Sequence, residues 1–222
     1  MNILAVDTSS ENLSLYIRKG KDKEIDFNRR IKFGASQLIS FIDKNLKRVK
    51  LSLSDIDTFV IGAGPGSFTG LRISFSLVKA FMLATKKPAI VLSSFYACAY
   101  PFKNKAEKVA VISDARRGLI YLASFNCQGG NLIKEVKAKL VTLDQLGKVS
   151  GDYLFITYDS NLRQQILGLN SQLSIYPQDV YPRAKYLMPL AEIYYNKGKF
   201  TSLDKLSPLY LHSKAPQVRR KK

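Results

Sequence analysis

Three loops of this 222-residue chain hold residues that could bind a phosphate group or a metal ion. The first, Asp7-Thr8-Ser9-Ser10, follows a short apolar run, and a carboxylate at a strand end suits a phosphate or metal site. The second is the glycine-rich stretch from Gly62 to Arg72, and the third begins at Asp114. The first two can equally be turns whose polar side chains only satisfy backbone donors. The possible, vestigial nucleotide or phosphate site consists of Asp7, Thr8, Ser9, Gly64, Gly66, Ser67 and Asp114.

The glycine-rich stretch does not fit the common nucleotide-binding motifs. A P-loop has a lysine directly after its last glycine, whereas here Leu71 follows Gly70. The dinucleotide fingerprint has its third glycine three residues after the second, and this stretch lacks that spacing. A tight turn with a helix capped by Ser67 or Thr69 explains the stretch at least as well as a phosphate cradle.

Metal and nucleophilic chemistry find little support in the rest of the chain. Cys98 and Cys127 are isolated, so neither a disulfide framework nor a zinc ribbon is indicated. No His-Glu-x-x-His motif is present, and a serine triad would have to use His212, the only histidine. We therefore assign no catalytic residue and no metal ligand.

The elements that must position these loops repeat once along the chain. Strands are expected at residues 2–6, 13–18, 25–27, 58–61 and 89–92, with helices at 36–49, 71–84 and 94–100. The first six of these elements follow the order βββαβα, which is that of a ribonuclease-H-like half. Strands at 109–112, 119–125 and 132–141 open a second, shorter half, which helices at 159–169 and 183–197 follow. We predict an α/β fold with subdomains at residues 1–104 and 105–213 and a mobile basic tail at 214–222.

The helix expected at residues 71–84 has an unusually wide apolar surface. Its apolar residues span an arc of about 220°, whereas a helix covering one sheet needs a stripe of about 100°. It should therefore bury a second face, against another helix of this chain or against a partner subunit. We expect an outward stripe on this helix to form a partner interface with the helix at 36–49, and the stripe of Ile73, Leu77, Ala80 and Ala84 to face the sheet. The interface residues are Leu38, Ile42, Leu46, Leu71, Phe75, Val78 and Met82.

The net charge of +18 indicates an acidic partner, of which nucleic acid is the first candidate. A lysine-rich genome that raises surface charge everywhere explains it equally well. The residues that could contact nucleic acid are Arg29, Arg30, Lys44, Lys47 and Arg48. With no signal peptide and no 18-residue apolar span, the sequence predicts a cytosolic protein that does not contact a membrane.

Four stretches carry a resemblance to a known family. They are residues 3–9, the stretch from Gly62 to Arg72, Asp114-Ala115-Arg116-Arg117-Gly118 with Tyr121, and residues 206–211. In these, the chain resembles the bacterial TsaB (YeaZ) family of threonylcarbamoyladenosine biosynthesis proteins. The resemblance implies the actin-like, sugar-kinase-like ATPase fold with two ribonuclease-H-like subdomains.

The resemblance further implies a non-catalytic subunit that pairs with the catalytic paralogue TsaD, and a TsaE-type ATPase that joins them. The complex places threonylcarbamoyl on the adenosine 3′ of the anticodon, in tRNAs that read codons beginning with adenine. TsaD-like proteins bind a metal through a His-x-x-x-His pair, and the matching helix here, at residues 93–99, holds no histidine. No cofactor is therefore expected on this subunit alone, with ATP and a divalent metal in the partner subunits. A homodimer is expected when TsaD is missing.

Two departures and two alternative functions accompany this resemblance. Family members often carry a histidine where this chain reads Phe33-Gly34-Ala35-Ser36, and the loop at Asp7 lacks the glycine usual in superfamily phosphate loops. A small-molecule kinase of the same superfamily is the first alternative, and it would use Asp7 for the metal and Asp114 as the base. A protease is the second.

Overall fold

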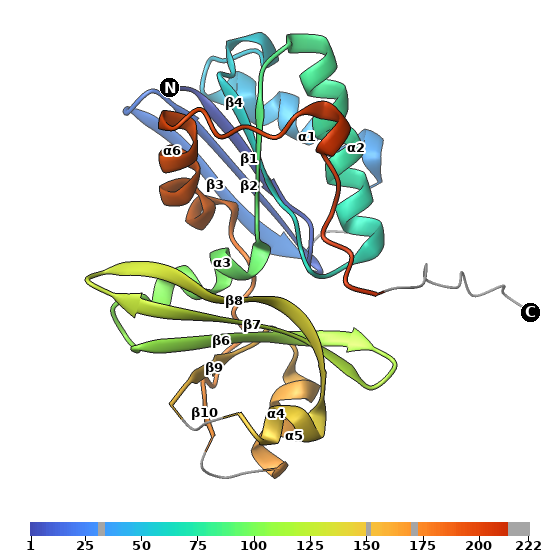
Figure 1. Ribbon diagram of the computed structural model, residues 1–222. Coiled ribbons are helices and arrows are strands. Elements are labelled where there is room, and N and C mark those ends of the chain that lie inside the picture. The colour runs from blue at the N-terminus through green and yellow to red at the C-terminus, as the bar shows by residue number, and fades with distance from the viewer. Residues whose placement is uncertain (31–33, 150–151, 170–172, 213–222) are drawn as a thin grey trace, which may run out of the picture.

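Two five-stranded sheets form the framework of the protein (Figure 1). The computed structural model describes residues 1–30, 34–149, 152–169 and 173–212. The first sheet consists of β1 (Ile3–Asp7), β2 (Asn12–Lys19), β3 (Lys23–Arg30), β4 (Thr58–Gly62) and β5 (Ala89–Leu92), in the order β3-β2-β1-β4-β5. β1, β2 and β3 form an antiparallel meander, and β4 and β5 run parallel to β1.

The second sheet repeats this topology. It consists of β6 (Lys108–Arg116), β7 (Leu119–Gln128), β8 (Asn131–Thr142), β9 (Leu154–Ile156) and β10 (Ser174–Ile175). Its order, β8-β7-β6-β9-β10, matches the first sheet strand for strand, with an antiparallel meander followed by two parallel strands. The predicted fold class, with two ribonuclease-H-like subdomains, is confirmed.

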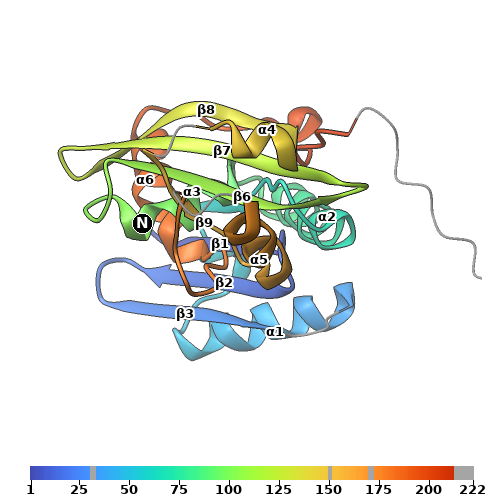
Figure 2. The same cartoon turned by 90° about the horizontal axis from the view of Figure 1, so that it is seen from below.

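Helices cover both faces of the first sheet. On one face lie α1 (Ala35–Arg48) and α2 (Phe68–Thr85), which share a core with Leu4, Val6, Phe59 and Ile61. Because strand side chains alternate in direction, Ile3, Ala5 and Val60 point the other way, toward α3 (Ser94–Ala99), η3 (Ala184–Leu187) and α6 (Met188–Asn196). That second core also contains Val109, Val111 and Phe125 of the second sheet, so it joins the two subdomains (Figures 1 and 2).

Two helices and three short 3₁₀ turns complete the structure. The helices α4 (Leu143–Gly147) and α5 (Ser160–Leu169) cover the far face of the second sheet, where Leu146 and Ile166 enter its core. The 3₁₀ turns are η1 (Leu53–Asp55), η2 (Tyr100–Phe102) and η4 (Leu203–Lys205).

The last part of the chain returns to the first sheet (Figure 1). Beyond Arg183, η3 packs against β1, β2 and β4, and α6 packs against β5. The Thr201 amide then donates to the carbonyl of Ala89 at 2.8 Å, and the Leu209 amide to that of Ala63 at 2.9 Å. The C-terminal segment therefore contributes to the first subdomain. The division at residue 104 stays a prediction, and the expected tail at 214–222 lies outside the described residues.

The outward stripe expected on α2 is instead part of the core. Leu71, Phe75 and Val78 are buried among the side chains of β1 and β4, and Met82 is half-buried beside them. The α1 residues of the expected interface, Leu38, Ile42 and Leu46, are buried in the same core. The assignment of faces was wrong because α1 and the sheet together cover the larger side chains. The solvent-facing residues of α2 are Phe68, Thr69, Arg72, Ser76, Ala80, Leu83 and Ala84.

By length and composition α2 could also cross a membrane. Core helices of globular proteins have the same properties, and the burial of Leu71, Phe75 and Val78 against the first sheet makes α2 a core helix here.

Candidate functional site

A cleft of about 1070 Å³ lies where the carboxyl ends of β1 and β4 face the β6–β7 turn of the second subdomain. Its first wall comes from the loop after β1 and the start of α2, including Ser9, Ser10, Gly66 and Ser67. Its second wall comes from the β6–β7 turn and the start of α5, including Asp114 and Asp159. The C-terminal segment from Leu209 to His212 lines it as well.

The structure brings only part of the predicted phosphate site to this cleft. Ser9, Gly66, Ser67 and Asp114 line it. Asp7 is instead buried behind the cleft wall, where its carboxylate accepts hydrogen bonds from the amide and hydroxyl of Ser9 at 2.8 and 2.6 Å. Its Oδ2 lies so close to Gly62 that a Cβ there would come within 1.9 Å of it. Asp7 itself therefore does not line the cleft.

The glycine-rich stretch packs against the loop after β1. A Cβ at Gly66 would lie 2.0 Å from the Ser9 carbonyl oxygen, and one at Gly70 would lie 2.1 Å from the Thr8 carbonyl oxygen. The Ser67 amide donates to the Ser9 carbonyl at 2.6 Å, and the Thr8 hydroxyl donates to the Gly70 carbonyl at 2.8 Å. Groups that a phosphate cradle would direct at its ligand therefore bond the two loops together.

The start of α2 agrees with the prediction of a tight turn followed by a helix that Ser67 caps. Ser67 is the N-cap, and its hydroxyl accepts a hydrogen bond from the Gly70 amide at 3.2 Å. Gly64 shapes the turn, with a φ of 88° and the Leu71 side chain against its Cα, and it does not line the cleft.

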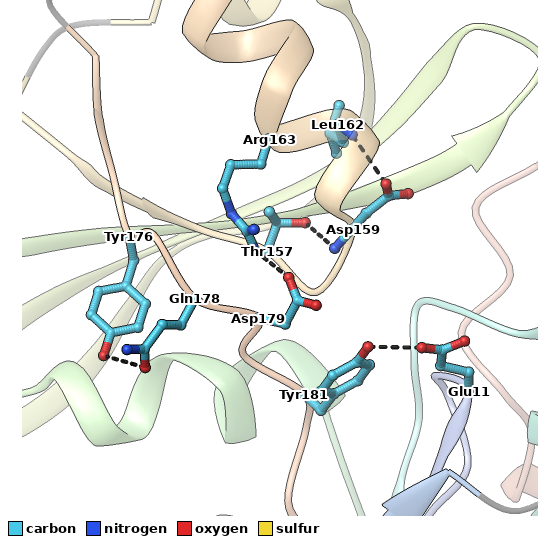
Figure 3. Close-up of polar contacts among 9 residues, drawn as sticks. All are labelled: Glu11, Thr157, Asp159, Leu162, Arg163, Tyr176, Gln178, Asp179 and Tyr181. Carbon is cyan, nitrogen blue, oxygen red and sulfur yellow. Dashed lines mark hydrogen bonds and ion pairs between the residues drawn. The ribbon is translucent and has the colours of Figure 1, made fainter.

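Tyrosines and acidic residues that the sequence analysis missed also line the cleft, among them Glu11, Asp159, Asp179 and Tyr181, whose polar contacts Figure 3 shows. The Tyr181 hydroxyl donates to Glu11 at 2.7 Å across the two subdomains, and Arg30 pairs with the same carboxylate at 3.0 Å. Asp159 accepts from the Leu162 amide as the cap of α5, and Asp179 pairs with Arg163. Asp159 follows an apolar strand and precedes a helix, a signal that could have identified it. Each of these acidic groups therefore already has a partner within the protein.

The histidine required by the protease alternative is engaged elsewhere. His212 Nε2 makes a hydrogen bond of 2.8 Å with the Ala115 carbonyl oxygen, and the ring packs edge-on against Tyr121. In the described part of the chain no group of three His, Cys, Asp or Glu side chains could hold a metal ion.

The predicted tRNA-contacting residues are all exposed, on the end of β3 and on α1. Arg30 lines the cleft and pairs with Glu11, and Lys47 pairs with Asp43 at 2.7 Å along α1. The guanidinium of Arg48 donates to Asn45. Contact between this surface and tRNA stays a prediction.

Asp7 should make the stability of the protein depend on pH. Burial raises the pKa of its carboxyl, and the opposing hydrogen bonds from Ser9 do not cancel this effect. Above the usual Asp pKa of about 4 the unfolded chain loses a proton that the folded chain keeps. The free energy of unfolding therefore falls as pH rises from there through the folded-state pKa. The variant Asp7→Asn should lose this dependence, and urea midpoints across the pH range would measure it.

The matched control for this experiment is Asp55→Asn, which should have the opposite sign. Asp55 accepts hydrogen bonds from the hydroxyl and amide of Ser52, which lower its pKa. Asp55 therefore contributes to the free energy of unfolding above the usual Asp pKa, and this contribution is lost as pH falls. Parallel pH profiles for wild type and Asp7→Asn would contradict the expectation for Asp7.

Comparison with known proteins agrees with this architecture. The sequence model of the family described as TsaD, tRNA N6-adenosine threonylcarbamoyltransferase, matches residues 34–165, more than half of the chain. The chain is 26% identical to the tRNA threonylcarbamoyladenosine biosynthesis protein TsaB of Escherichia coli K12, over 96% of this chain and 95% of that protein. It is also 26% identical to the TsaB of Bacillus subtilis 168, over 75% of each chain. The structure of YeaZ from Pseudomonas aeruginosa, 22% identical, superposes with a TM-score of 0.80 over 94% of this chain and all of that one, and shares its fold.

Proposed function

Because the chain belongs to the threonylcarbamoyltransferase family, and within it to the TsaB (YeaZ) group, we propose that it is the non-catalytic partner of a TsaD-type transferase. The complex would form N6-threonylcarbamoyladenosine beside the anticodon of tRNAs that read codons beginning with adenine. A TsaE-type ATPase would join it, ATP and a divalent metal would be held by the partner subunits, and the complex would work in the cytosol. The curated relatives carry threonylcarbamoyladenosine biosynthesis in their names, which supports this pathway.

One observation favours the non-catalytic role over the kinase alternative. The loops that would hold a phosphate and a metal in a superfamily kinase are bonded to each other, through Ser67 to Ser9 and through Thr8 to Gly70. The single histidine, His212, also leaves α3 without the metal-binding pair that TsaD-like proteins carry. A chain that binds neither group can still present a surface to a partner that does.

The solvent-facing side of α2 is the surface we propose for that partner. Its middle carries Ser76 and Ala80, which let another backbone approach closely, and Leu83 beside them is 54% exposed. α1 contacts α2 along the first sheet, so the two helices present one continuous ridge. The same ridge would form a homodimer when the partner is missing.

The decisive experiment combines the purified chain with a TsaD-type protein, a TsaE-type protein, tRNA, ATP and the threonylcarbamoyl donor. Modification should require this chain and should be absent when the chain is supplied alone. Ala80→Glu should abolish co-elution with the TsaD-type protein and reduce tRNA modification by more than about tenfold, because it places a charge at the centre of the interface.

The matched control is Gln164→Glu, which adds the same charge on an exposed side of α5 in the other subdomain. It should pair and support modification as the wild type does. Equal pairing by Ala80→Glu would show that the interface lies elsewhere. Modification without any need for this chain would refute the proposed function.

A further inference from the structure

The β6–β7 turn at the mouth of the cleft places two arginines in an unfavourable backbone conformation. Arg117 and Gly118 form the two-residue connection between Arg116 and Leu119, with φ of 57° and 71°, and Arg116 has a φ of 66°. Such turns prefer Asn or Gly, because a Cβ is disfavoured at positive φ. Residues kept in strained conformations gather at functional sites, so the two arginines need a reason beyond the fold.

The two side chains are available to a ligand. Arg116 and Arg117 are both exposed and line the cleft. Arg116 pairs with Asp114 at 3.3 Å while its side chain stays 89% exposed, and no ion pair of Arg117 occurs among the described residues. A third lining arginine, Arg30, is paired with Glu11 at 3.0 Å. Both side chains therefore remain open to an anionic ligand in the cleft.

An exposed aromatic pair faces the same mouth. Phe68, at the start of α2, and Tyr210, in the C-terminal segment, are 37% and 49% exposed, with ring centroids 5.3 Å apart. Both line the cleft, and the guanidinium of Arg72 lies 5.2 Å from the centroid of Phe68. In Figure 1 the tip of the β6–β7 hairpin projects on the same side of the molecule as the start of α2 and the C-terminal segment.

We infer that this mouth binds an unpaired segment of RNA, with a base stacked on Phe68 and Tyr210 and the flanking phosphates on Arg116 and Arg117. Exposed aromatic rings beside arginines are the usual means of holding single-stranded RNA. The chain's net charge of +18 complements that ligand. The inference rests on the proposed function, since tRNA would be the natural source of such a segment. It adds a contact at the β6–β7 turn and the start of α2 to the residues already predicted on β3 and α1.

The test exploits the strained turn. Arg116→Gly with Arg117→Asn removes two charges and installs residues that favour positive φ, so the melting temperature should stay equal or rise. Affinity for a short fluorescein-labelled single-stranded RNA, measured by anisotropy, should fall at least about tenfold. The slope of log affinity against log salt should lose about 1.4, which is roughly 0.7 for each lost phosphate contact.

A closely matched control exists in the same chain. Lys50 and Lys86 also have positive φ, of 56° and 59°, and lie at the C-terminal ends of α1 and α2. Lys50→Gly with Lys86→Asn removes the same charge and relieves the same strain at two helix ends that do not line the cleft. This variant should keep wild-type RNA affinity and salt slope. Equal loss in both double variants would mean that only net charge attracts RNA, and the inference would be wrong.

The aromatic pair gives a second, independent test. Tyr210→Ala should weaken binding of the single strand by roughly 5- to 150-fold, whereas Tyr210→Phe keeps the ring and should bind nearly as the wild type does. An RNA duplex of the same sequence should be insensitive to Tyr210→Ala, because its bases are already stacked. Unchanged single-strand affinity in Tyr210→Ala would overturn the stacking contact.

Parallel measurement of pairing with the TsaD-type protein separates this inference from the proposed function. The arginine variant should still co-elute with that partner while its complex binds RNA more weakly. Normal pairing with unchanged RNA affinity would refute the RNA site and leave the proposed function standing. Lost pairing with unchanged RNA affinity would make the mouth a protein contact. Failure of the wild type to pair would refute the proposed function itself.

Discussion

Phe75→Glu is expected to unfold the protein. Phe75 is only 3% exposed and lies in the core that α2 and α1 form with the first sheet. Truncating a buried Phe to Ala already costs about 3–5 kcal/mol, and a charge that has no partner in this core adds to that loss. Because a domain is typically stable by only about 5–15 kcal/mol, most molecules should be unfolded at room temperature. Loss of the cooperative thermal transition, followed by circular dichroism, would show it.

The matched control for this prediction is Ala80→Glu on the same helix. Ala80 is five residues further along and faces solvent, so the same glutamate should leave the transition nearly unchanged. Phe75→Leu, which keeps an apolar side chain, should remain folded with a modest loss of stability. A folded Phe75→Glu protein that fails only to pair with its partner would mean that the stripe of Leu71, Phe75 and Val78 faces outward after all.

Gly66→Ala should also be severely destabilising. The added Cβ would lie 2.0 Å from the carbonyl oxygen of Ser9, a backbone atom that accepts a 2.6 Å hydrogen bond from the Ser67 amide. Moving the loop after β4 away from the loop after β1 would break that bond. In addition, Gly66 has a φ of 156°, which L-residues rarely adopt. We expect a loss of about 3 kcal/mol or more in the free energy of unfolding, measured by urea denaturation.

Gly168→Ala provides the contrast. Gly168 lies inside α5 and a Cβ there would meet no atom within 4 Å, so alanine should stabilise the helix by roughly 0.5–1 kcal/mol. Gly66→Ala with wild-type stability would show that the loops after β1 and β4 are loosely packed, and that the stretch is free to hold a phosphate after all.

The strands of the first half and the opening meander of the second were predictable because each buries one or both faces. Runs such as Ile3–Asp7 and Thr58–Gly62 are fully buried. In β2, the apolar residues Leu13, Leu15 and Ile17 alternate with other residue types along the sequence. β9 and β10 were missed because strands of three and two residues carry no periodicity. Their place in the sheet follows from β6, with which β9 pairs in parallel.

The glycine-rich stretch shows how far local pattern reaches into the site. The sequence allowed either a tight turn with a capped helix or a phosphate cradle. The hydroxyl of Ser67 caps α2, as the first interpretation requires. Whether the loop encloses a ligand or another loop depends on what lies opposite. That is Thr8 and Ser9, about sixty residues earlier in the chain. Likewise, Phe68 and Tyr210 meet only because the C-terminal segment returns to the first sheet.

The sequence by itself determined the α/β class, the duplicated order of elements, the family resemblance and the lack of a histidine pair. These follow from residue types and from periodicity along one element, which neighbouring residues decide. The tertiary structure alone decided which stripe of α2 is buried, that Asp7 lies behind the cleft wall and that the strained Arg116 and Arg117 stand at its mouth. The physical reason is that burial and unpaired charge depend on contacts between residues far apart in the chain, which no local pattern records.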